Sequence, residues 1–230
     1  MTKIHAVIFD MDGVVINSEP LGLRANTELF KQLGLDVPES VYATFVGSAP
    51  TDNLRKLKQL YTIPLEYPEL IKFRSKIYFD LFDKAEDLQL MPGFIDFITY
   101  LKDNGIVTIL ATSSFREKIK RVFDKFPMLA SCFDDVVSGE DFEFTKPDPA
   151  IFIEAVKRTG FDKSECIIIE DSTNGIKAAK AAGVYCVAYK TGHGVTQDMT
   201  NADKIITDFR QLSPLTPEGG TAKWNSPFGG

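Results

Sequence analysis

The stretch His5-Ala-Val-Ile-Phe-Asp-Met-Asp-Gly13 decides the fold of this chain. Its apolar run, Ala6 to Phe9, predicts a strand buried on both faces, which is typical of a parallel sheet covered by helices. Asp10 and Asp12 follow at the carboxyl end of that strand, where such sheets bind their ligands. Because side chains alternate along a strand, we expect both carboxylates to face one place, where a metal ion or a shared proton would offset their repulsion.

Strands and helices alternate through most of the remaining chain. Apolar runs predict further strands at residues 106–111, 135–138, 165–170, 184–188 and 204–206. Helical spacing of apolar residues predicts helices at residues 94–101, 116–126, 150–159 and 174–182. This order predicts an α/β fold with a doubly wound, mostly parallel sheet, in other words a Rossmann-like core.

Residues 18–90 differ in character from the rest. They are rich in Leu, Phe, Lys and Glu at helical spacing, with no convincing strand, and Ser18 is suited to cap the first helix. We therefore expect a cap domain of about four helices at 18–90, inserted into a core domain formed by 1–17 and 91–215. The Gly- and Pro-rich segment 216–230 is interpreted as a tail without a functional role.

Composition narrows the range of partners. The chain has 230 residues and a formal net charge of −6, without the basic runs that nucleic acids or anionic membranes attract. No apolar stretch approaches the roughly 20 residues that span a bilayer, and no signal peptide is expected. Cys132, Cys166 and Cys186 form no metal or redox motif and are expected to be reduced. We expect a cytoplasmic monomer.

Polar residues that could carry chemistry follow four of the predicted strands or the loops after them. They are Asp10 and Asp12, then Thr112-Ser113, then Lys146 in Lys-Pro-Asp-Pro, and finally Glu170-Asp171. Each pattern has a structural alternative: an Asp-rich turn, a helix cap at Thr-Ser-Ser, a solvated loop lysine, and a helix cap at Glu-Asp-Ser. Carboxylates near Asp10 also suit Mg²⁺, which takes one or two of them together with water and phosphate oxygens.

In this order, the four places resemble the motifs of the haloacid dehalogenase-like superfamily of phosphoryl-transfer enzymes. The resemblance implies that Asp10 attacks phosphorus and that Asp12 protonates the leaving oxygen and later activates water. It also implies that Thr112 and Ser113 hold the phosphoryl group and that Lys146 neutralises its charge. Superfamily members that pump ions carry Thr at the position of Asp12, so Asp12 implies substrates with poor leaving groups, such as sugar or alcohol phosphates.

The resemblance further implies a Mg²⁺ cofactor. Its expected ligands are Asp10, the backbone carbonyl of Asp12, and Asp171. Glu170 is expected to act through water or from outside the ligand shell, with Ser172 and Asn174 orienting it.

The inserted cap resembles the subclass that includes β-phosphoglucomutase and hexose-phosphate phosphatases. Two cap positions depart from the mutase, because Gly22 stands where it carries His, and Pro50 of Gly47-Ser-Ala-Pro50 stands where it carries Arg. Arg74 matches a cap lysine of the mutase, and Gly47 begins the turn that corresponds to its Arg-bearing turn. Gly47 and Arg74 are therefore the candidate substrate contacts in the cap.

These features favour a Mg²⁺-dependent phosphatase acting on a small phosphorylated sugar or polyol. A β-phosphoglucomutase or related phosphomutase is the alternative, and a catalytically silent binding protein is a third. Dehalogenation is disfavoured, since Asp12 and the expected Mg²⁺ carboxylates have no role in it.

Overall fold

The structure is a computed structural model that describes residues 3–42, 50–192 and 197–212. It divides into two compact units. The core comprises, among the described residues, 3–16, 90–192 and 197–212; the cap comprises 17–42 and 50–89. In the described ranges, no helix is both long and apolar enough to cross a membrane.

The core is built on a six-stranded sheet with the order β3-β2-β1-β4-β5-β6, in which every pairing is parallel. The strands are β1 (Ala6–Phe9), β2 (Val107–Thr112), β3 (Asp135–Ser138), β4 (Cys166–Glu170), β5 (Tyr185–Tyr189) and β6 (Lys204–Ile206). The reversal of order at β1 and β4 is that of a doubly wound fold. The predicted fold class is therefore confirmed.

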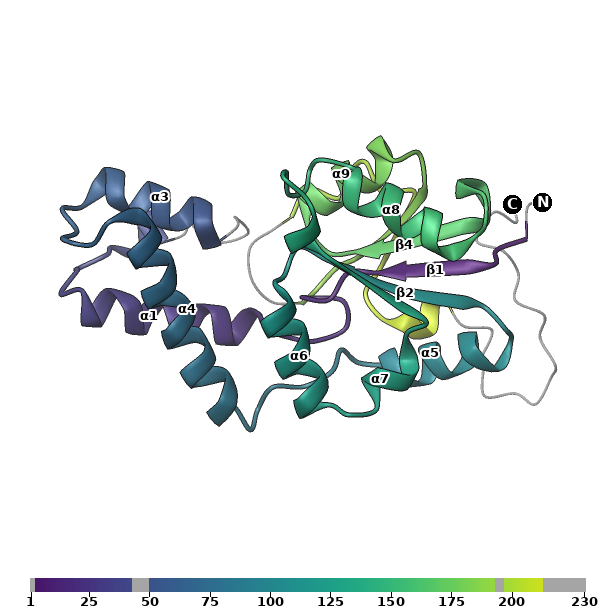
Figure 1. The fold of residues 1–230 in the computed structure, drawn as a ribbon, viewed down its shortest axis with the longest axis horizontal. Helices are drawn as coiled ribbons and strands as arrows, with labels where there is room; N and C mark the ends of the chain where they lie inside the picture. The colour runs from purple at the N-terminus through teal and green to yellow at the C-terminus, as the bar shows by residue number, and fades with distance from the viewer. Residues whose placement is uncertain (1–2, 43–49, 193–196, 213–230) are drawn as a thin grey trace. The chain divides into compact units, whose positions relative to one another are not determined.

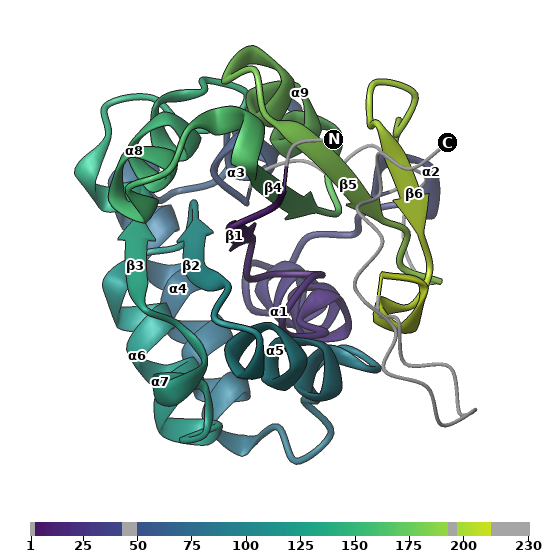
Figure 2. The ribbon, with the colours of Figure 1, turned by 90° about the vertical axis from the view of Figure 1, so that its right-hand side faces the viewer.

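Helices cover both faces of the sheet. Figures 1 and 2 show α8 and α9 on one face and α5, α6 and α7 on the other. The core helices are α5 (Phe94–Asp103), α6 (Arg116–Lys125), α7 (Leu129–Cys132), α8 (Ala150–Thr159) and α9 (Thr173–Ala181), with single 3₁₀ turns η1 (Gly139–Asp141), η2 (Lys163–Glu165) and η3 (Phe209–Gln211). The four longer core helices were predicted, whereas α7 and the 3₁₀ turns were not.

Strand β1 illustrates why these residues form a central strand. Its four side chains are all at most 1% exposed. Ala6 and Ile8 join the cluster that contains the inner faces of α8 and α9. Phe9, in contrast, makes edge-to-face contacts with Phe94 and Phe97 of α5. Alternate side chains thus fill two apolar layers, which is why the run is apolar without a break.

Two predicted helix caps are wrong in their detail. Ser18 is the N-cap residue of α1 (Glu19–Gln32), but its side chain makes no capping hydrogen bond. Helix α6 has Phe115 as its N-cap residue, so Thr112, Ser113 and Ser114 do not cap it. The hydroxyl of Thr112 instead accepts a hydrogen bond from the Ser114 N–H within the loop, at 3.1 Å.

All the regular elements in the described part of the cap are helices. It contains α1, α2 (Glu39–Tyr42), α3 (Pro50–Leu60) and α4 (Tyr67–Lys84), as expected from the helical spacing. Helices α1 and α4 pack against each other, and each has buried apolar residues, such as Leu21 and Leu29 in α1 and Leu70 and Ile77 in α4.

The two chain segments that lead into and out of the cap run side by side. Ile16 forms an antiparallel bridge with Leu90. The Met91 N–H donates to the Val15 carbonyl at 2.9 Å, and the Asn17 N–H donates to the Gln89 carbonyl at 2.9 Å. The insertion therefore begins and ends at neighbouring points of the backbone.

Candidate active site

Three of the predicted residues meet at the carboxyl end of the central strands. Asp10 directly follows β1, and its N–H still pairs with the Ile169 carbonyl of β4 at 3.0 Å. Lys146 Nζ donates to Asp10 Oδ1 at 2.6 Å and to Glu170 Oε1 at 2.8 Å. The lysine comes from the loop between η1 and α8, so its charge bridges carboxylates from β1 and β4.

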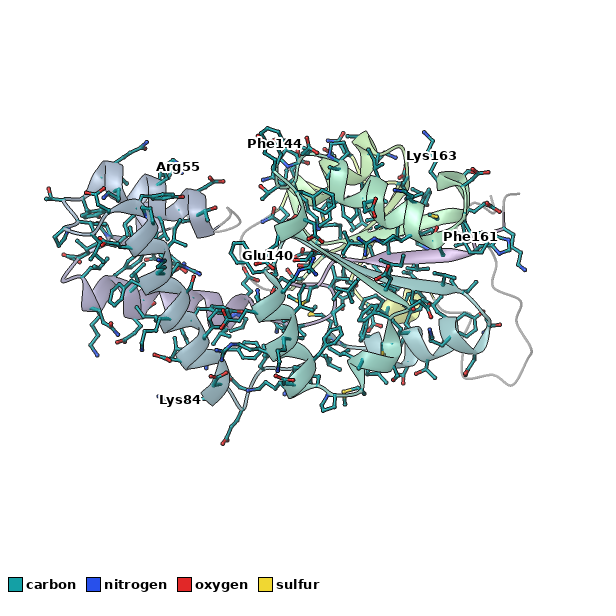
Figure 3. All side chains as sticks on the ribbon, in the orientation of Figure 1. Arg55, Lys84, Glu140, Phe144, Phe161 and Lys163 are labelled. Carbon is teal, nitrogen blue, oxygen red and sulfur yellow. The ribbon has the colours of Figure 1, made fainter. Side chains whose placement is uncertain are left out.

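Residues labelled in Figure 3 show where the carboxyl ends of the strands lie. Phe144, two residues before Lys146 in the chain, lies with Glu140 towards the carboxyl ends of the strands, whereas Phe161 and Lys163 lie at the opposite end.

The three bridged groups are almost wholly removed from water. The side chains of Lys146, Asp10 and Glu170 are 7%, 10% and 1% exposed. Burial raises the pKa of Asp10 to about 7, with repulsion from Glu170 and Asp12 acting in the same direction against the lowering effect of Lys146. Burial alone would lower the pKa of Lys146, but Asp10 and Glu170 hold that pKa above its usual range. The lysine is therefore charged, as a carboxylate partner requires.

Asp12 has a separate set of partners. Strand β1 ends at Phe9, so the strand alternation predicted for Asp10 and Asp12 does not extend to Asp12. Its carboxylate accepts hydrogen bonds from Lys118 Nζ at 2.7 Å to each oxygen, and from Ser114 Oγ at 2.9 Å. Asp12 nevertheless lies close enough to Asp10 to raise the pKa of Asp10 by repulsion.

Thr112 is the last residue of β2 and is 1% exposed. Its Oγ1 accepts the Ser114 N–H, which leaves the hydroxyl proton available to a further acceptor. Ser113 is exposed, and its backbone lies against Gly139, where a Cβ would come within 2.7 Å of the Ser113 carbonyl oxygen. Ser138 Oγ also donates to the Ser114 carbonyl at 3.1 Å. The loop after β2 is thus fixed to the end of β3.

Glu170 is held from two sides. Its Oε1 accepts a hydrogen bond from Lys146 Nζ. Its Oε2 accepts hydrogen bonds from the Ser172 N–H at 2.7 Å and the Ser172 hydroxyl at 3.0 Å. The same hydroxyl accepts the Gly175 N–H, so Ser172 both caps α9 and orients Glu170. Asn174 is exposed and makes no hydrogen bond to Glu170 in the described part of the chain, so its expected orienting role is not supported.

Asp171 lies against the turn that carries Asp10 and Asp12. Gly13 has φ +77°, and a Cβ at this position would collide with the Asp171 carboxylate. Burial raises the pKa of Asp171 well above its usual range, and repulsion from Glu170 and Asp10 adds to the effect. Glycine is therefore required at residue 13 for two reasons: backbone conformation and the close approach of a carboxylate.

The donor set is compatible with a magnesium ion. Asp10, Asp12, Glu170 and Asp171 are four carboxylates that repel one another, against the two ammonium groups of Lys118 and Lys146. Among the described residues, no three His, Cys, Asp or Glu side chains form a metal-binding group. Magnesium does not need one, because it binds through one or two carboxylates, waters and substrate phosphate.

Of the two candidate substrate contacts in the cap, only Arg74 lies among the described residues. Gly47 lies outside the described residues. Arg74 is on α4, where its Nε donates to Asn26 Oδ1 of α1 at 3.1 Å and its guanidinium lies 5.8 Å from the ring centre of Tyr78. Burial lowers the pKa of Arg74 from its usual value, with Tyr78 and Tyr42 opposing the shift. Of the positions that depart from the mutase, Gly22 lies in α1 and Pro50 begins α3.

Sequence reasoning missed Ser114 and Lys118, whose side chains donate to Asp12. Lys118 lies in the first turn of α6, whereas Ser114 precedes Phe115, the N-cap residue of that helix. Their position just after the Thr112 motif was the available signal. The Asp12 contact itself spans 106 residues of sequence for Lys118 and 102 for Ser114, which no local pattern reveals.

Comparison with known proteins matches residues 4–183 to the family described as haloacid dehalogenase-like hydrolase. Protein SUPPRESSOR OF QUENCHING 1, chloroplastic, from Arabidopsis thaliana is 35% identical over 82% of this chain. The match spans only 18% of the length of that relative. The Phosphorylated carbohydrates phosphatase of Thermotoga maritima is 30% identical, over 94% of this chain and 95% of its own length.

A similar fold is found among solved structures. The crystal structure of CbbY from Rhodobacter sphaeroides in complex with phosphate superposes with a TM-score of 0.79 and 25% sequence identity. The superposition covers 91% of this chain and 96% of CbbY.

Proposed function

Because this chain belongs to the haloacid dehalogenase-like hydrolase family, we propose that it hydrolyses phosphoric monoesters through an aspartyl-phosphate formed on Asp10. The observation that carries the proposal is the Lys146 bridge, which joins Asp10 to Glu170 at the carboxyl end of the central strands. A buried lysine beside a buried carboxylate opposes the effect of burial on the pKa of that carboxylate, and it offsets the charge of an arriving phosphate.

The proposed reaction has two displacements. In the first, an Asp10 oxygen bonds to phosphorus, the bond from phosphorus to the ester oxygen breaks, and the Asp12 carboxyl group gives its proton to that oxygen. In the second, Asp12 takes a proton from water, the water oxygen bonds to phosphorus, and the bond to Asp10 breaks. Inorganic phosphate leaves and both aspartates return to their initial states.

Thr112 and Ser113 are the proposed phosphoryl-binding pair. The Thr112 hydroxyl accepts a hydrogen bond from the loop backbone, which orients its own proton elsewhere. We propose that this proton is donated to a phosphoryl oxygen, and that the exposed Ser113 adds a second donor. Lys146 contacts the same group and stabilises the negative charge that spreads over the equatorial oxygens.

Asp10, the carbonyl oxygen of Asp12, and Asp171 are the proposed Mg²⁺ ligands. The surroundings of Asp171 support this assignment, because burial first, and then repulsion from Glu170 and Asp10, raise the pKa of Asp171, and a bound cation would favour its ionised form. Bound Mg²⁺ would supply positive charge beside the phosphoryl oxygens. Glu170, held by Ser172 and Lys146, would act from outside the ligand shell.

The proposed substrate is a small phosphorylated sugar or polyol. The Thermotoga maritima relative, whose name states that it acts on phosphorylated carbohydrates, supports this class. Within the cap, Arg74 supplies a cation that donates to Asn26 and makes no ion pair with a carboxylate among the described residues. We propose that Arg74 binds a hydroxyl or carboxylate group of the substrate, and that Gly47, which lies outside the described residues, is a second substrate contact.

We further propose a monomer in a reducing compartment such as the cytoplasm. Cys132, Cys166 and Cys186 are free and buried, which supports the reducing environment. Sedimentation at micromolar concentration would test the monomer.

Phosphate release should be measured across hexose, polyol and glycolate phosphates, with Mg²⁺ and with EDTA. We expect Mg²⁺-dependent release from at least one sugar or polyol phosphate, and none from the Asp10→Asn variant. Trapping with acid should leave phosphate on the wild-type protein and not on the variant.

β-Glucose 1-phosphate belongs in the same panel. Its conversion to glucose 6-phosphate without net phosphate release would identify a phosphomutase instead. Absence of turnover on every substrate, with phosphate esters still bound, would identify a binding protein.

A further inference from the structure

Lys118 is the least expected residue at the candidate site. It lies in the first turn of α6, and its Nζ sits 2.7 Å from each carboxylate oxygen of Asp12. The side chain is only 18% exposed. By contrast, Lys120 on the same helix is 75% exposed and pairs with Asp124 four residues away. One lysine of α6 is thus directed towards Asp12, while Lys120 lies in solvent.

Ordering Lys118 in this way has a conformational cost. A lysine side chain loses rotamer freedom when it is fixed. The helix does not require the contact, because α6 is anchored by its own buried residues Ile119 and Val122. The contact of Lys118 with Asp12 is therefore not explained by the stability of α6, and its effect is on the position of Asp12.

Ser114 completes the arrangement around Asp12. Its hydroxyl donates to Asp12 Oδ2 at 2.9 Å, while its N–H donates to Thr112 and its carbonyl accepts from Ser138. Asp12 is thus restrained from two directions, by a serine fixed to the ends of β2 and β3 and by a lysine on α6. Two bonds to one oxygen and one to the other define the rotation of the carboxyl plane.

We propose that Lys118 is a positioning residue for Asp12, which together with Ser114 fixes the carboxyl group that exchanges protons during phosphoryl transfer. This inference rests on the proposed function, because it assumes that Asp12 protonates the leaving oxygen. Lys118 does not touch the reacting phosphorus in this scheme. Its loss should therefore affect only reactions in which the leaving oxygen needs a proton.

Two classes of substrate separate this role from simple phosphate binding. An alkyl phosphate, such as a hexitol phosphate, leaves as a basic alkoxide and needs protonation. 4-Nitrophenyl phosphate leaves as a stable phenolate and does not. The value of kcat/KM covers the reaction up to release of the alcohol or phenol, so it isolates the step in which Asp12 acts as an acid.

The experiment compares Lys118→Met, Lys118→Arg and the control Lys120→Met with the wild-type protein. Lys118→Met should lower kcat/KM for the alkyl phosphate by about 10–100-fold, part of the 10²–10⁴ that a general acid supplies. For 4-nitrophenyl phosphate the loss should stay below about threefold. Lys118→Arg should recover at least part of the loss, and Lys120→Met should match the wild type for both substrates.

A double variant tests whether Lys118 acts through Asp12. In the Asp12→Asn background, adding Lys118→Met should cause no further loss with the alkyl phosphate, because the group being positioned is already gone. Thermal unfolding of each variant checks that the fold is retained.

Equal losses for both substrates would overturn the inference and make Lys118 a phosphate-binding residue. Full activity of Lys118→Met would also overturn it, because the ion pair with Asp12 would then have no part in the reaction. A wild-type protein that turns over neither substrate would instead refute the proposed function itself.

Discussion

Lys146 in the core is buried and Arg74 in the cap is half-buried, and the two cations have opposite kinds of partner. Lys146 in the core is bound by two carboxylates, and its pKa is held above its usual range. Arg74 in the cap donates to the amide of Asn26 and lies near Tyr78, without a carboxylate partner among the described residues, and its pKa is lowered. A buried charge is costly unless it is paired, so the two sites use charge for different purposes.

The different partners of Lys146 and Arg74 suggest different proposed roles, Lys146 in the reaction itself and Arg74 in the recognition of the substrate. The charge of Lys146 is offset by Asp10 and Glu170 in the unliganded protein, so the lysine is held in place for the proposed reaction, whose chemistry is common to all phosphate esters. Among the described residues of the cap, the Arg74 guanidinium donates to Asn26 and forms no ion pair, which suits contact with the variable part of the proposed substrate. We therefore expect substitution of Lys146 to affect every substrate and substitution of Arg74 to affect only some.

Removal of Lys146 should give the largest effect. Lys146→Ala takes away the charge that offsets the phosphoryl oxygens, and kcat should fall by about 10²–10⁴ for every substrate tested. The control is Lys157→Ala on the neighbouring helix α8, where the lysine is 79% exposed. Steady-state kinetics measure both. A change below about threefold for Lys146→Ala would make that lysine an ordinary loop residue and remove the contrast with Arg74.

Gly13→Ala should give the next largest effect. The new methyl group would displace the Asp171 carboxylate, and the Mg²⁺ concentration for half-maximal activity should rise by about 10–100-fold. Gly105→Ala is the matched control, because Gly105 also has a positive φ of +68°, but nothing lies within 4 Å of the place that its Cβ would occupy. Equal behaviour of the two variants in Mg²⁺ titrations would show that Asp171 does not bind the metal.

Arg74→Met should change substrate preference rather than chemistry. We expect kcat/KM for the preferred sugar or polyol phosphate to fall by about 10-fold or more, as for loss of a hydrogen bond to a charged group. Activity on 4-nitrophenyl phosphate should stay the same. Lys72→Met, at an exposed position of the same helix, is the control. Equal losses on both substrates would contradict the division of roles between core and cap.

The smallest effect is expected at an ion pair of the core that is open to solvent. Burial opposes ionisation of Asp134, but hydrogen bonds from Lys102 and Thr108 lower the pKa of Asp134 overall. A carboxyl group with a lowered pKa stabilises the fold above its unfolded pKa of about 4, and this contribution is lost as the pH falls. Asp134→Asn should therefore cost about 1 kcal/mol at pH 7, screened by solvent, and less at pH 3.

Denaturant unfolding at the two pH values measures this effect. Asp124→Asn, in the exposed pair with Lys120, should cost less than about 0.5 kcal/mol at either pH. A larger cost for Asp124→Asn than for Asp134→Asn would show that the Thr108 hydrogen bonds add nothing.

Local sequence patterns predicted the elements of the core well, because its strands are uninterrupted apolar runs. A one-residue shift nevertheless changed the description of Thr112. The predicted strand ended at residue 111, whereas β2 runs to Thr112, so this residue is buried rather than part of a loop. The helix α7 was missed because four residues are too few to show a helical period.

The contacts of the site were harder to predict than its residues. Lys146 meets Asp10 across 136 residues of sequence, and Lys118 meets Asp12 across 106. Parallel strand ends bring such residues to one edge, but which lysine pairs with which carboxylate depends on loop conformation. Strand alternation could not place Asp12, because the strand ends three residues earlier, at Phe9.

The adjacency of the segments that enter and leave the cap has an evolutionary consequence. Ile16 and Leu90 pair with each other, so the chain returns to its starting point whatever lies between them. Doubling the length of such an insertion costs only about 0.6 kcal/mol of closure entropy. Caps of other sizes and sequences could therefore be exchanged at this junction without rebuilding the sheet. A lineage could acquire new substrates by replacing the inserted cap segment while keeping the residues of the candidate site in the core.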